Sequence, residues 1–134
     1  MTAGYSGTPL PKKLGIKDGS RVTLLGAPDN FAAVLGDLPP GVKVRSKAAG
    51  DSDVILLFAT TFSRLKAEFG KAMKLMPADG GMLWVAWPKK AAKMETDLDE
   101  NLIRDFGLAA GVVDTKVCAI DATWSGLRFN RRRT

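Results

Sequence analysis

Hydroxyl groups, an indole ring and two lysines follow the longest apolar runs of the chain, and they are its best candidates for ligand chemistry. Thr60, Thr61 and Ser63 come directly after the run 54–59, where a helix is expected to start, and helix N-termini attract anions. Two lysines after the run 82–87 would add positive charge at the same edge of a sheet. The sequence therefore predicts a small-anion site. Its candidate residues are Gly26, Asn30, Thr60, Thr61, Ser63, Trp87, Lys89 and Lys90.

A purely structural interpretation of these residues stays open. Thr61 then only caps a helix, Trp87 belongs to the core, and the lysines are solvated.

Catalytic chemistry has few candidates in this composition. The chain has no histidine and one cysteine, which excludes a Cys/His zinc site and removes the usual base of a nucleophilic serine or cysteine. Cys118 lies in an apolar strand pattern that is typical of a buried, unreactive thiol. Asp97 and Glu100, with Asp99 between them, are typical of a helix start. We expect no catalytic residue, no metal and no cofactor, and we therefore favour a non-catalytic Rossmann-like binding or protein-interaction module. The first alternative is an enzyme or a nucleotide- or anion-binding protein that uses the carboxyl edge of the strands.

Positive charge is concentrated near the end of the chain. The formal net charge is +6, and the remainder of the chain is close to neutral once the last arginines are set aside. A basic tail over 130–134 suggests a second alternative, an accessory protein that binds nucleic acid, although a solvated terminus explains the same pattern. The arginines concerned are Arg128, Arg131, Arg132 and Arg133.

The bulk composition is that of a globular protein, with 46% hydrophobic and 25% charged residues. The apolar runs are too short to span a bilayer, and the first residues do not have the pattern of a secretory signal. We therefore expect a cytoplasmic protein whose partner is another protein or a small anionic ligand, with no membrane involved.

The pattern of elements indicates an α/β fold in a single domain over 1–134. Glycines and prolines make 1–19 an irregular arm with a short turn at 11–14, which packs Tyr5, Leu10 and Ile16 on the body or forms a flap. Strands are expected at 21–25, 42–45, 53–59, 82–87 and 112–122, with a turn at 124–126 and a return strand at 127–131.

Three helices are expected between these strands. One begins near Asp29 or Asn30 and runs to Leu38 before the stop at 39–41. Another is capped by Thr60 or Thr61, and the last begins at Asp97 and Glu100 and runs to Gly111. The middle helix has the clearest apolar stripe: Phe62, Leu65, Phe69, Ala72, Met73 and Met76.

Alternating strands and helices predict a mostly parallel sheet with helices packed on it and an antiparallel hairpin at the C-terminus. The direction of the strand at 42–45 is left open. Only 47–52 connects it to the next strand, so either this link crosses the sheet without a helix or the strand runs antiparallel.

Four stretches, 4–10, 12–16, 83–90 and 121–127, resemble a family of small uncharacterised bacterial proteins that is classed as a domain of unknown function. More distantly, Gly80 and Gly81 before a strand, followed by a helix, a long strand and a hairpin, resemble a shortened class I methyltransferase or Rossmann-like sheet. That resemblance implies the fold. It does not imply S-adenosylmethionine binding, because Ala27 and Pro28 replace the glycine-rich turn and Arg45 stands where that family has an acidic residue.

Overall fold

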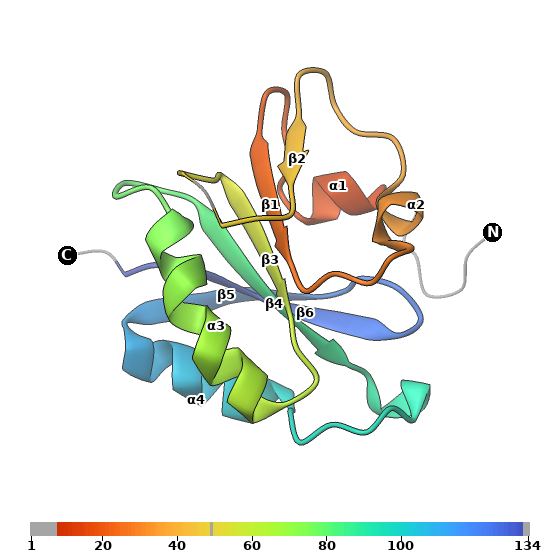
Figure 1. Cartoon of the computed structure of the whole chain (residues 1–134), viewed down its shortest axis with the longest axis vertical. Coiled ribbons are helices and arrows are strands. Elements are labelled where there is room, and N and C mark those ends of the chain that lie inside the picture. Colours follow the sequence, from red (N-terminus) through yellow and green to blue (C-terminus); the bar gives the residue numbers. More distant parts are fainter. Residues whose placement is uncertain (1–7, 49, 133–134) are drawn as a thin grey trace.

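A computed structural model describes residues 8–48 and 50–132 of the chain (Figure 1). Tyr5 and Arg133, which the sequence analysis singled out, lie outside the described residues. The helices are α1 (Leu10–Lys13), α2 (Phe31–Leu35), α3 (Phe62–Leu75), the 3-10 turn η1 (Lys90–Ala92) and α4 (Glu100–Ala110). The strands are β1 (Arg21–Leu25), β2 (Lys43–Arg45), β3 (Val54–Phe58), β4 (Met82–Pro88), β5 (Val112–Ala119) and β6 (Trp124–Arg131).

The strands form one six-stranded sheet in the order β2-β1-β3-β4-β6-β5. Strands β1 to β4 are parallel, and β6 pairs antiparallel with both β4 and β5. The predicted α/β fold, with a mostly parallel sheet and a C-terminal antiparallel hairpin, is therefore confirmed.

Strand β2 runs parallel to β1, so the link after it crosses the sheet without a helix. The register explains how so short a link suffices. Thr23 of β1 is opposite Arg45, the last residue of β2, and Val22 is opposite Val54, the first residue of β3. The chain therefore moves sideways by about two strand spacings, roughly 10 Å, and hardly along the strands.

Helices α3 and α4 lie together on one face of the sheet (Figure 1). Thr61 caps α3 by accepting a hydrogen bond from the Arg64 N–H, as the sequence predicted. The apolar stripe is also confirmed: Leu65, Phe69, Ala72 and Met76 are buried, and Phe62 and Met73 pack against them. Helix α4 comes so close to β6 that a Cβ at Gly107 would lie 2.2 Å from the Phe129 ring.

The other face is covered by much shorter elements. Leu10, Leu14 and Ile16 from the arm pack with Phe31 and Leu35 of α2 over the sheet. The short turn expected at 11–14 is therefore present as α1, and the described part of the arm packs on the body. The Trp84 Nε1–H donates to the Leu14 carbonyl at 3.0 Å and ties the arm to β4.

Four predicted boundaries are wrong. The strand expected at 112–122 ends at Ala119. Helix α2 ends at Leu35 rather than Leu38, because Gly36 leaves the helical conformation with φ 76° and ψ −153°. Helix α4 is capped by Asp99, whose carboxylate accepts from the Leu102 N–H, and not by Asp97. The hairpin turn comes before Trp124 and not at 124–126, because the Asp121 carboxylate accepts from the Thr123 and Trp124 N–H groups and closes the turn there.

No helix in the described residues combines the length and the apolar character that crossing a bilayer requires.

Candidate functional site

A hollow of about 370 Å³ opens at the carboxyl ends of β1 and β3, the edge where open α/β sheets bind ligands. We call it the Trp124 hollow. Arg64 is the one charged side chain among its lining residues, and Trp124 packs edge-on against Phe58 with ring centroids 5.2 Å apart. The lining residues are Gly26, Phe58, Ala59, Thr60, Thr61, Arg64 and Trp124.

Gly26 is required at this edge by its backbone. It turns the chain at the end of β1 with φ 71°, a conformation that side chains with a Cβ rarely adopt. A Cβ here would also lie 3.0 Å from the Phe58 carbonyl oxygen. The glycine therefore lets the turn lie close to the end of β3 and shapes one side of the hollow.

A carboxylate of the protein already binds the N-terminus of α3, next to the hollow. The Asp97 carboxylate accepts from the Phe62 N–H at 2.8 Å, and the Thr96 hydroxyl donates to the Thr60 carbonyl at 2.6 Å. The Asp97 carboxylate and the Thr61 cap thus satisfy the N–H groups of Phe62 and Arg64 in the first turn of the helix, and the Thr96 hydroxyl satisfies the carbonyl just before it. An external anion at this edge would therefore meet the Arg64 side chain more readily than the helix N-terminus.

The predicted lysines belong to a different part of the edge. Lys90 and Trp87 line a second hollow of about 320 Å³, which we call the Lys90 hollow. Lys89 precedes it, and the Lys89 N–H donates to the Thr123 carbonyl at 2.8 Å. Acidic side chains contribute to this hollow, so its charge is mixed. The other lining residues are Pro88, Thr96, Leu98, Asp99, Glu100 and Asn101.

The structure thus divides the predicted anion-binding residues. Gly26, Thr60 and Thr61 meet at the Trp124 hollow, while Trp87 and Lys90 line the Lys90 hollow. Ser63 is exposed in the first turn of α3, and exposed Asn30 precedes α2 without a side-chain cap hydrogen bond.

Sequence reasoning missed Arg64 and Trp124. Arg64 could have been found from its place three residues after the Thr61 cap, in the first turn of α3. Trp124 had no such signal, since it comes from the strand after the hairpin turn.

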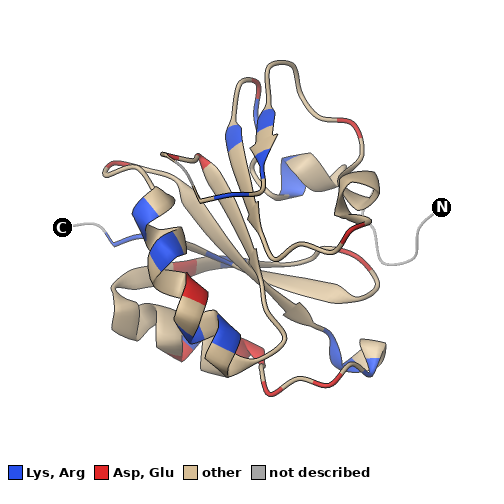
Figure 2. Ribbon diagram, viewed as in Figure 1, with Lys and Arg blue, Asp and Glu red and all other residues tan. Residues whose placement is uncertain are grey.

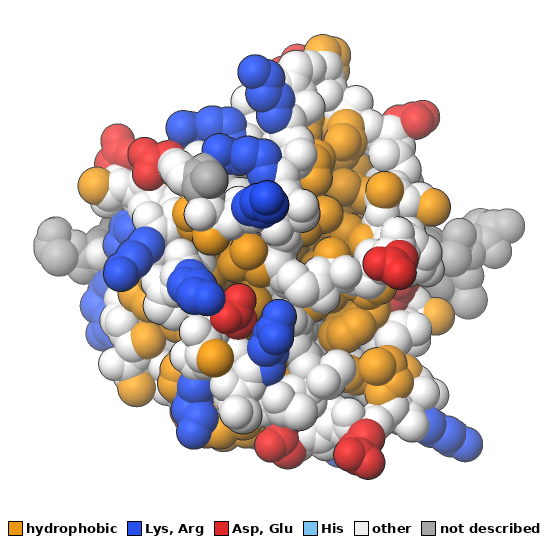
Figure 3. Space-filling view, in the orientation of Figure 1, with side chains coloured by type: hydrophobic (Ala, Val, Ile, Leu, Met, Phe, Trp, Pro, Cys, Tyr) orange, Lys and Arg blue, Asp and Glu red, His pale blue; other side chains and the backbone are white. Residues whose placement is uncertain are grey.

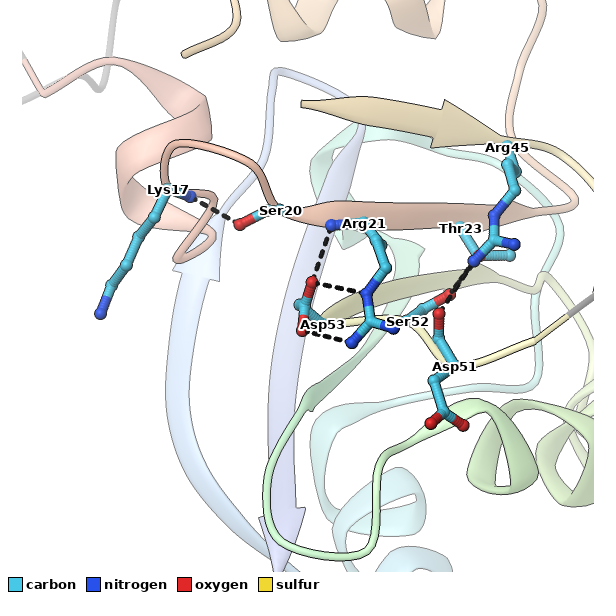
Figure 4. Close-up of polar contacts among 8 residues, drawn as sticks. All are labelled: Lys17, Ser20, Arg21, Thr23, Arg45, Asp51, Ser52 and Asp53. Atoms are coloured by element: carbon cyan, nitrogen blue, oxygen red, sulfur yellow. Dashed lines mark hydrogen bonds and ion pairs between the residues drawn. The ribbon is translucent and has the colours of Figure 1, made fainter. Parts of the chain in front are cut away.

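At the β1–β2 edge of the sheet, Arg45 ends β2 at the position where the methyltransferase resemblance implies an acidic residue (Figure 4). The Arg45 guanidinium donates to the Asp51 carbonyl at 2.9 Å and to the Ser52 hydroxyl at 3.2 Å. Ser52 also shares a 2.6 Å hydrogen bond with Thr23 of β1. Arg45 therefore fastens the link 46–53 across β1, a structural use that the sequence did not reveal.

The neighbouring Arg21 and Asp53 form the most complete ion pair at this edge (Figure 4). Asp53 accepts from the Arg21 backbone N–H at 2.8 Å and from the guanidinium at 3.0 and 3.1 Å. The side-chain hydrogen bond from Arg21 lowers the pKa of the Asp53 carboxyl from its ordinary value. The pair fixes the start of β3 beside β1.

The predicted basic tail is largely part of the fold. Arg131 is the last residue of β6, and its guanidinium donates to the Met76 and Pro77 carbonyls at 2.8 and 2.7 Å, beside the end of α3. Arg128, also in β6, donates to the Thr115 hydroxyl and lies 5.8 Å from the Trp84 ring. Arg132 donates to the Leu108 carbonyl at 3.4 Å.

A larger hollow, of about 820 Å³, lies beside Arg131 at the opposite edge of the sheet from the Trp124 hollow. Two of its polar side chains are committed to the fold, since Asn130 donates to the Gly81 carbonyl and Arg131 binds the carbonyls after α3. We therefore place the candidate site at the Trp124 hollow.

The remaining candidates have structural surroundings. Glu100 pairs with Arg104, which also bonds Asp114 at 2.8 Å. Cys118 is buried, and this burial raises the pKa of its thiol, which disfavours the nucleophilic thiolate.

Comparison with solved structures finds methyltransferase-like folds. The chain is similar to a SAM-dependent methyltransferase from Aquifex aeolicus, with a TM-score of 0.58 and 16% identity, covering 90% of this chain and 87% of the other. It is also similar to LepI in complex with SAM, with a TM-score of 0.55 and 11% identity, over 93% of this chain and 47% of LepI. PhzM, a pyocyanin biosynthetic protein, matches with a TM-score of 0.53 and 12% identity, over 92% of this chain and 53% of PhzM.

No protein-family model matches the chain, and no curated protein matches it in sequence. The resemblance to a family of small bacterial proteins therefore stays a prediction. At identities this low, the solved structures show a shared fold: the chain has a class I methyltransferase-like, Rossmann-like architecture, and it spans about half the length of LepI and PhzM.

Proposed function

We propose that this chain is a non-catalytic binding module on a methyltransferase-like fold, and that it takes a small anionic ligand at the Trp124 hollow. The observation that carries this proposal is the combination of one cation, Arg64, with the indole of Trp124 at the carboxyl ends of β1 and β3. An arginine binds a carboxylate or phosphate in a bidentate manner, and an aromatic ring beside it favours a ligand with a flat apolar part.

The side chains around the hollow support binding more than turnover. Besides Arg64, the residues with polar side-chain atoms that line it are Thr60, Thr61 and Trp124, and Thr61 is engaged in capping α3. General acid–base catalysis needs a group that titrates near the working pH, and neither a guanidinium nor a threonine hydroxyl does so. The hollow is also at the small end of the range for ligand pockets.

S-adenosylmethionine fits this edge less well than a small anion. The turn after Gly26 continues with Ala27 and Pro28, and α2 has only five residues. Arg45, at the end of β2, is committed to the Asp51 carbonyl and the Ser52 hydroxyl. An arginine there supplies hydrogen-bond donors where a ribose would need acceptors.

The test is a thermal-shift and calorimetric screen with inorganic phosphate, citrate, AMP and S-adenosylmethionine. A ligand at one hundred times its Kd stabilises the folded protein by about 2.7 kcal/mol, which raises the Tm by several degrees. Arg64→Gln should abolish the shift given by the anion that binds. The matched control is Lys66→Gln, an exposed cation two residues further along the same helix.

A double variant, Lys89→Gln with Lys90→Gln, separates this proposal from the site that the sequence predicted. If the double variant loses binding and Arg64→Gln does not, the ligand lies at the Lys90 hollow and the proposal is wrong about its place. Micromolar binding of S-adenosylmethionine would contradict the non-catalytic assignment, and no binding by any of the four probes would overturn the proposal.

A further inference from the structure

Helix α3 turns a row of cations away from the core. Arg64, Lys66, Lys71 and Lys74 are all exposed, while Leu65, Phe69, Ala72 and Leu75 between them are buried. From Arg64 to Lys74 the row extends about 15 Å along the helix. Glu68 is the one acid of this helix, and it pairs with Lys71 at 3.3 Å.

The sheet register adds basic side chains on the same side of the molecule. Val22 and Val44 are opposite each other, and Val22 belongs to the core on the α1–α2 face. Because side chains alternate along a strand, Arg21, Lys43 and Arg45 point to the other face, the one that α3 covers. For Arg45 the contacts agree, since its guanidinium donates to the Ser52 hydroxyl at 3.2 Å and the Ser52 N–H donates to the Leu75 carbonyl of α3 at 2.8 Å.

We call the surface made by these segments the basic face. Figure 2 shows Lys and Arg positions in blue along β1, β2, the link after β2 and α3, and acidic positions in red along the loop before α4 at the lower edge. Figure 3 shows blue side chains gathered over the same part of the view. The acids of the same segments are Asp51, Asp53 and Glu68, and two of these are paired with Arg21 and Lys71. The basic face comprises Arg21, Lys43, Arg45, Lys47, Arg64, Lys66, Lys71 and Lys74.

This distribution shows which part of the molecule the net positive charge comes from. Eight basic and three acidic residues on these segments account for most of the formal net charge of +6. The opposite sign gathers around the start of α4, at Glu95, Asp97, Asp99 and Glu100. The positive field thus comes from a continuous folded surface, whereas the sequence had attributed it to the C-terminal tail.

The chemistry of the basic face selects among anionic partners. Membrane-surface binding combines basic charge with apolar side chains that enter the lipid, but on these segments the exposed large apolar residue is Val44, which points to the other face of the sheet. Single-stranded nucleic acid is bound by stacking on exposed aromatic rings, and Phe62, the aromatic residue of α3's first turn, is half-buried against Phe106.

We propose that the basic face binds the phosphate backbone of double-stranded nucleic acid without reading its sequence. Duplex DNA presents a phosphate every 3.4 Å or so along each strand, so the row on α3 spans several of them. Lysines and arginines that meet phosphates fix position and supply affinity, and they carry no base specificity. Arg64 also lines the Trp124 hollow, but the variants that test the basic face leave Arg64 unchanged, so the two proposals are tested separately.

The test measures fluorescence anisotropy of a labelled 20-base-pair DNA duplex of arbitrary sequence with the full chain at 50 and 200 mM salt. Four phosphate contacts predict a loss of affinity of roughly a hundredfold between the two salt concentrations. The variant Lys43→Gln, Lys47→Gln, Lys71→Gln, Lys74→Gln should lose most binding and most of the salt dependence.

A control variant removes the same charge elsewhere: Lys12→Gln, Lys17→Gln, Lys90→Gln and Lys116→Gln, all at exposed positions outside the basic face. Binding that survives in the control and is lost in the basic-face variant supports the proposal, provided that both variants keep the parent's Tm. Equal losses in the two variants would show a response to net charge alone and would overturn it.

Two further arms exclude other sources of the signal. Arg132→Gln with Arg133→Gln tests the tail, and loss of binding there with the basic face intact would contradict the proposal. Vesicles containing phosphatidylserine test a lipid surface, and tighter binding to them than to the duplex would contradict it as well. No binding of the duplex by the parent chain at 50 mM salt ends the proposal.

Discussion

The two faces of the sheet are covered in opposite ways. On one face, α3 and α4 have 14 and 11 residues and are amphipathic along their length. On the other face, α1 and α2 have four and five residues, and the covering is completed by the irregular arm and by Ile120 and Trp124 at the hairpin between β5 and β6. Each face nevertheless has its own cluster of buried apolar residues. The apolar stripe of a long amphipathic helix determines which of its sides is buried. The placement of a short helix depends instead on contacts with residues far away in the chain.

The largest loss of stability is expected when an aromatic side chain buried under α3 is truncated. Phe69 is 2% exposed and meets Phe106 and Phe129 edge-on, with ring centroids 5.1 and 5.9 Å apart. Phe69→Ala should lower the free energy of unfolding by about 3 to 5 kcal/mol, through lost burial and a cavity that two long helices cannot close. Chemical denaturation with urea measures this.

Lys71→Ala, on the exposed side of the same helix, is the control for that experiment and should cost under about 0.5 kcal/mol. Similar losses of unfolding free energy in the two variants would show that the apolar stripe of α3 does not stabilise this face of the sheet.

A smaller and more local effect is expected on the opposite face. Trp84→Phe removes the donor to the Leu14 carbonyl and leaves that buried group without its partner, which costs about 1 to 3 kcal/mol. Because this bond joins the arm to β4, limited proteolysis by trypsin should cut after Lys12 or Lys13 faster in the variant than in the parent. Unchanged cleavage would show that apolar packing alone holds the arm.

One stabilising interaction on the α3 side comes from β6 and is not predicted by the helical pattern. Arg131→Gln removes the guanidinium that binds the carbonyls of Met76 and Pro77, and it should cost about 1 to 2 kcal/mol. Arg132→Gln, one residue further, should change stability by less than about 0.5 kcal/mol, since its contact with Leu108 is long. Thermal unfolding of the two variants compares them directly. Equal stabilities would show that Arg131 contributes no more to the fold than Arg132, as expected for a solvated tail residue.

The smallest expected effect concerns pH. Hydrogen bonding to Arg21 lowers the pKa of the Asp53 carboxyl, so the folded state favours the ionised form. The pair's contribution to stability is therefore complete above the ordinary aspartate pKa of about 3.9 and is lost as the pH falls through the lowered value. Asp53→Asn should therefore lower stability slightly near neutral pH, and the difference from the parent should shrink as the pH falls, which flattens the acid limb of the stability curve. An acid limb identical to the parent's would exclude Asp53 as a contributor.

Particular elements show how much of the fold followed from the sequence. The α3 stripe, the Thr61 cap and the apolar runs of β3 and β4 were all readable, because burial periodicity and capping are local properties. The α/β class and the hairpin followed from the order of these elements. The turn before Trp124 was misplaced, because an aspartate that closes a turn with its side chain looks like any other loop residue.

The candidate site depended more on tertiary structure. The sequence located the correct sheet edge through Gly26, Thr60 and Thr61, since ligands favour the carboxyl ends of parallel strands. The sequence also predicted Lys89 and Lys90 at that edge. In the structure the Asp97 carboxylate occupies the Phe62 N–H at the start of α3, and Lys90 lines the separate Lys90 hollow.

The sequence by itself thus determined the elements, the α/β class and the composition of each helix face, because these depend on residues within a few turns of one another. Tertiary structure decided the direction of β2, the role of Arg45 and Arg131, and the meeting of Arg64 with Trp124. Each of these brings together groups from distant strands and links. Their positions depend on register and on the path of a crossing link, and no local pattern in the chain encodes either.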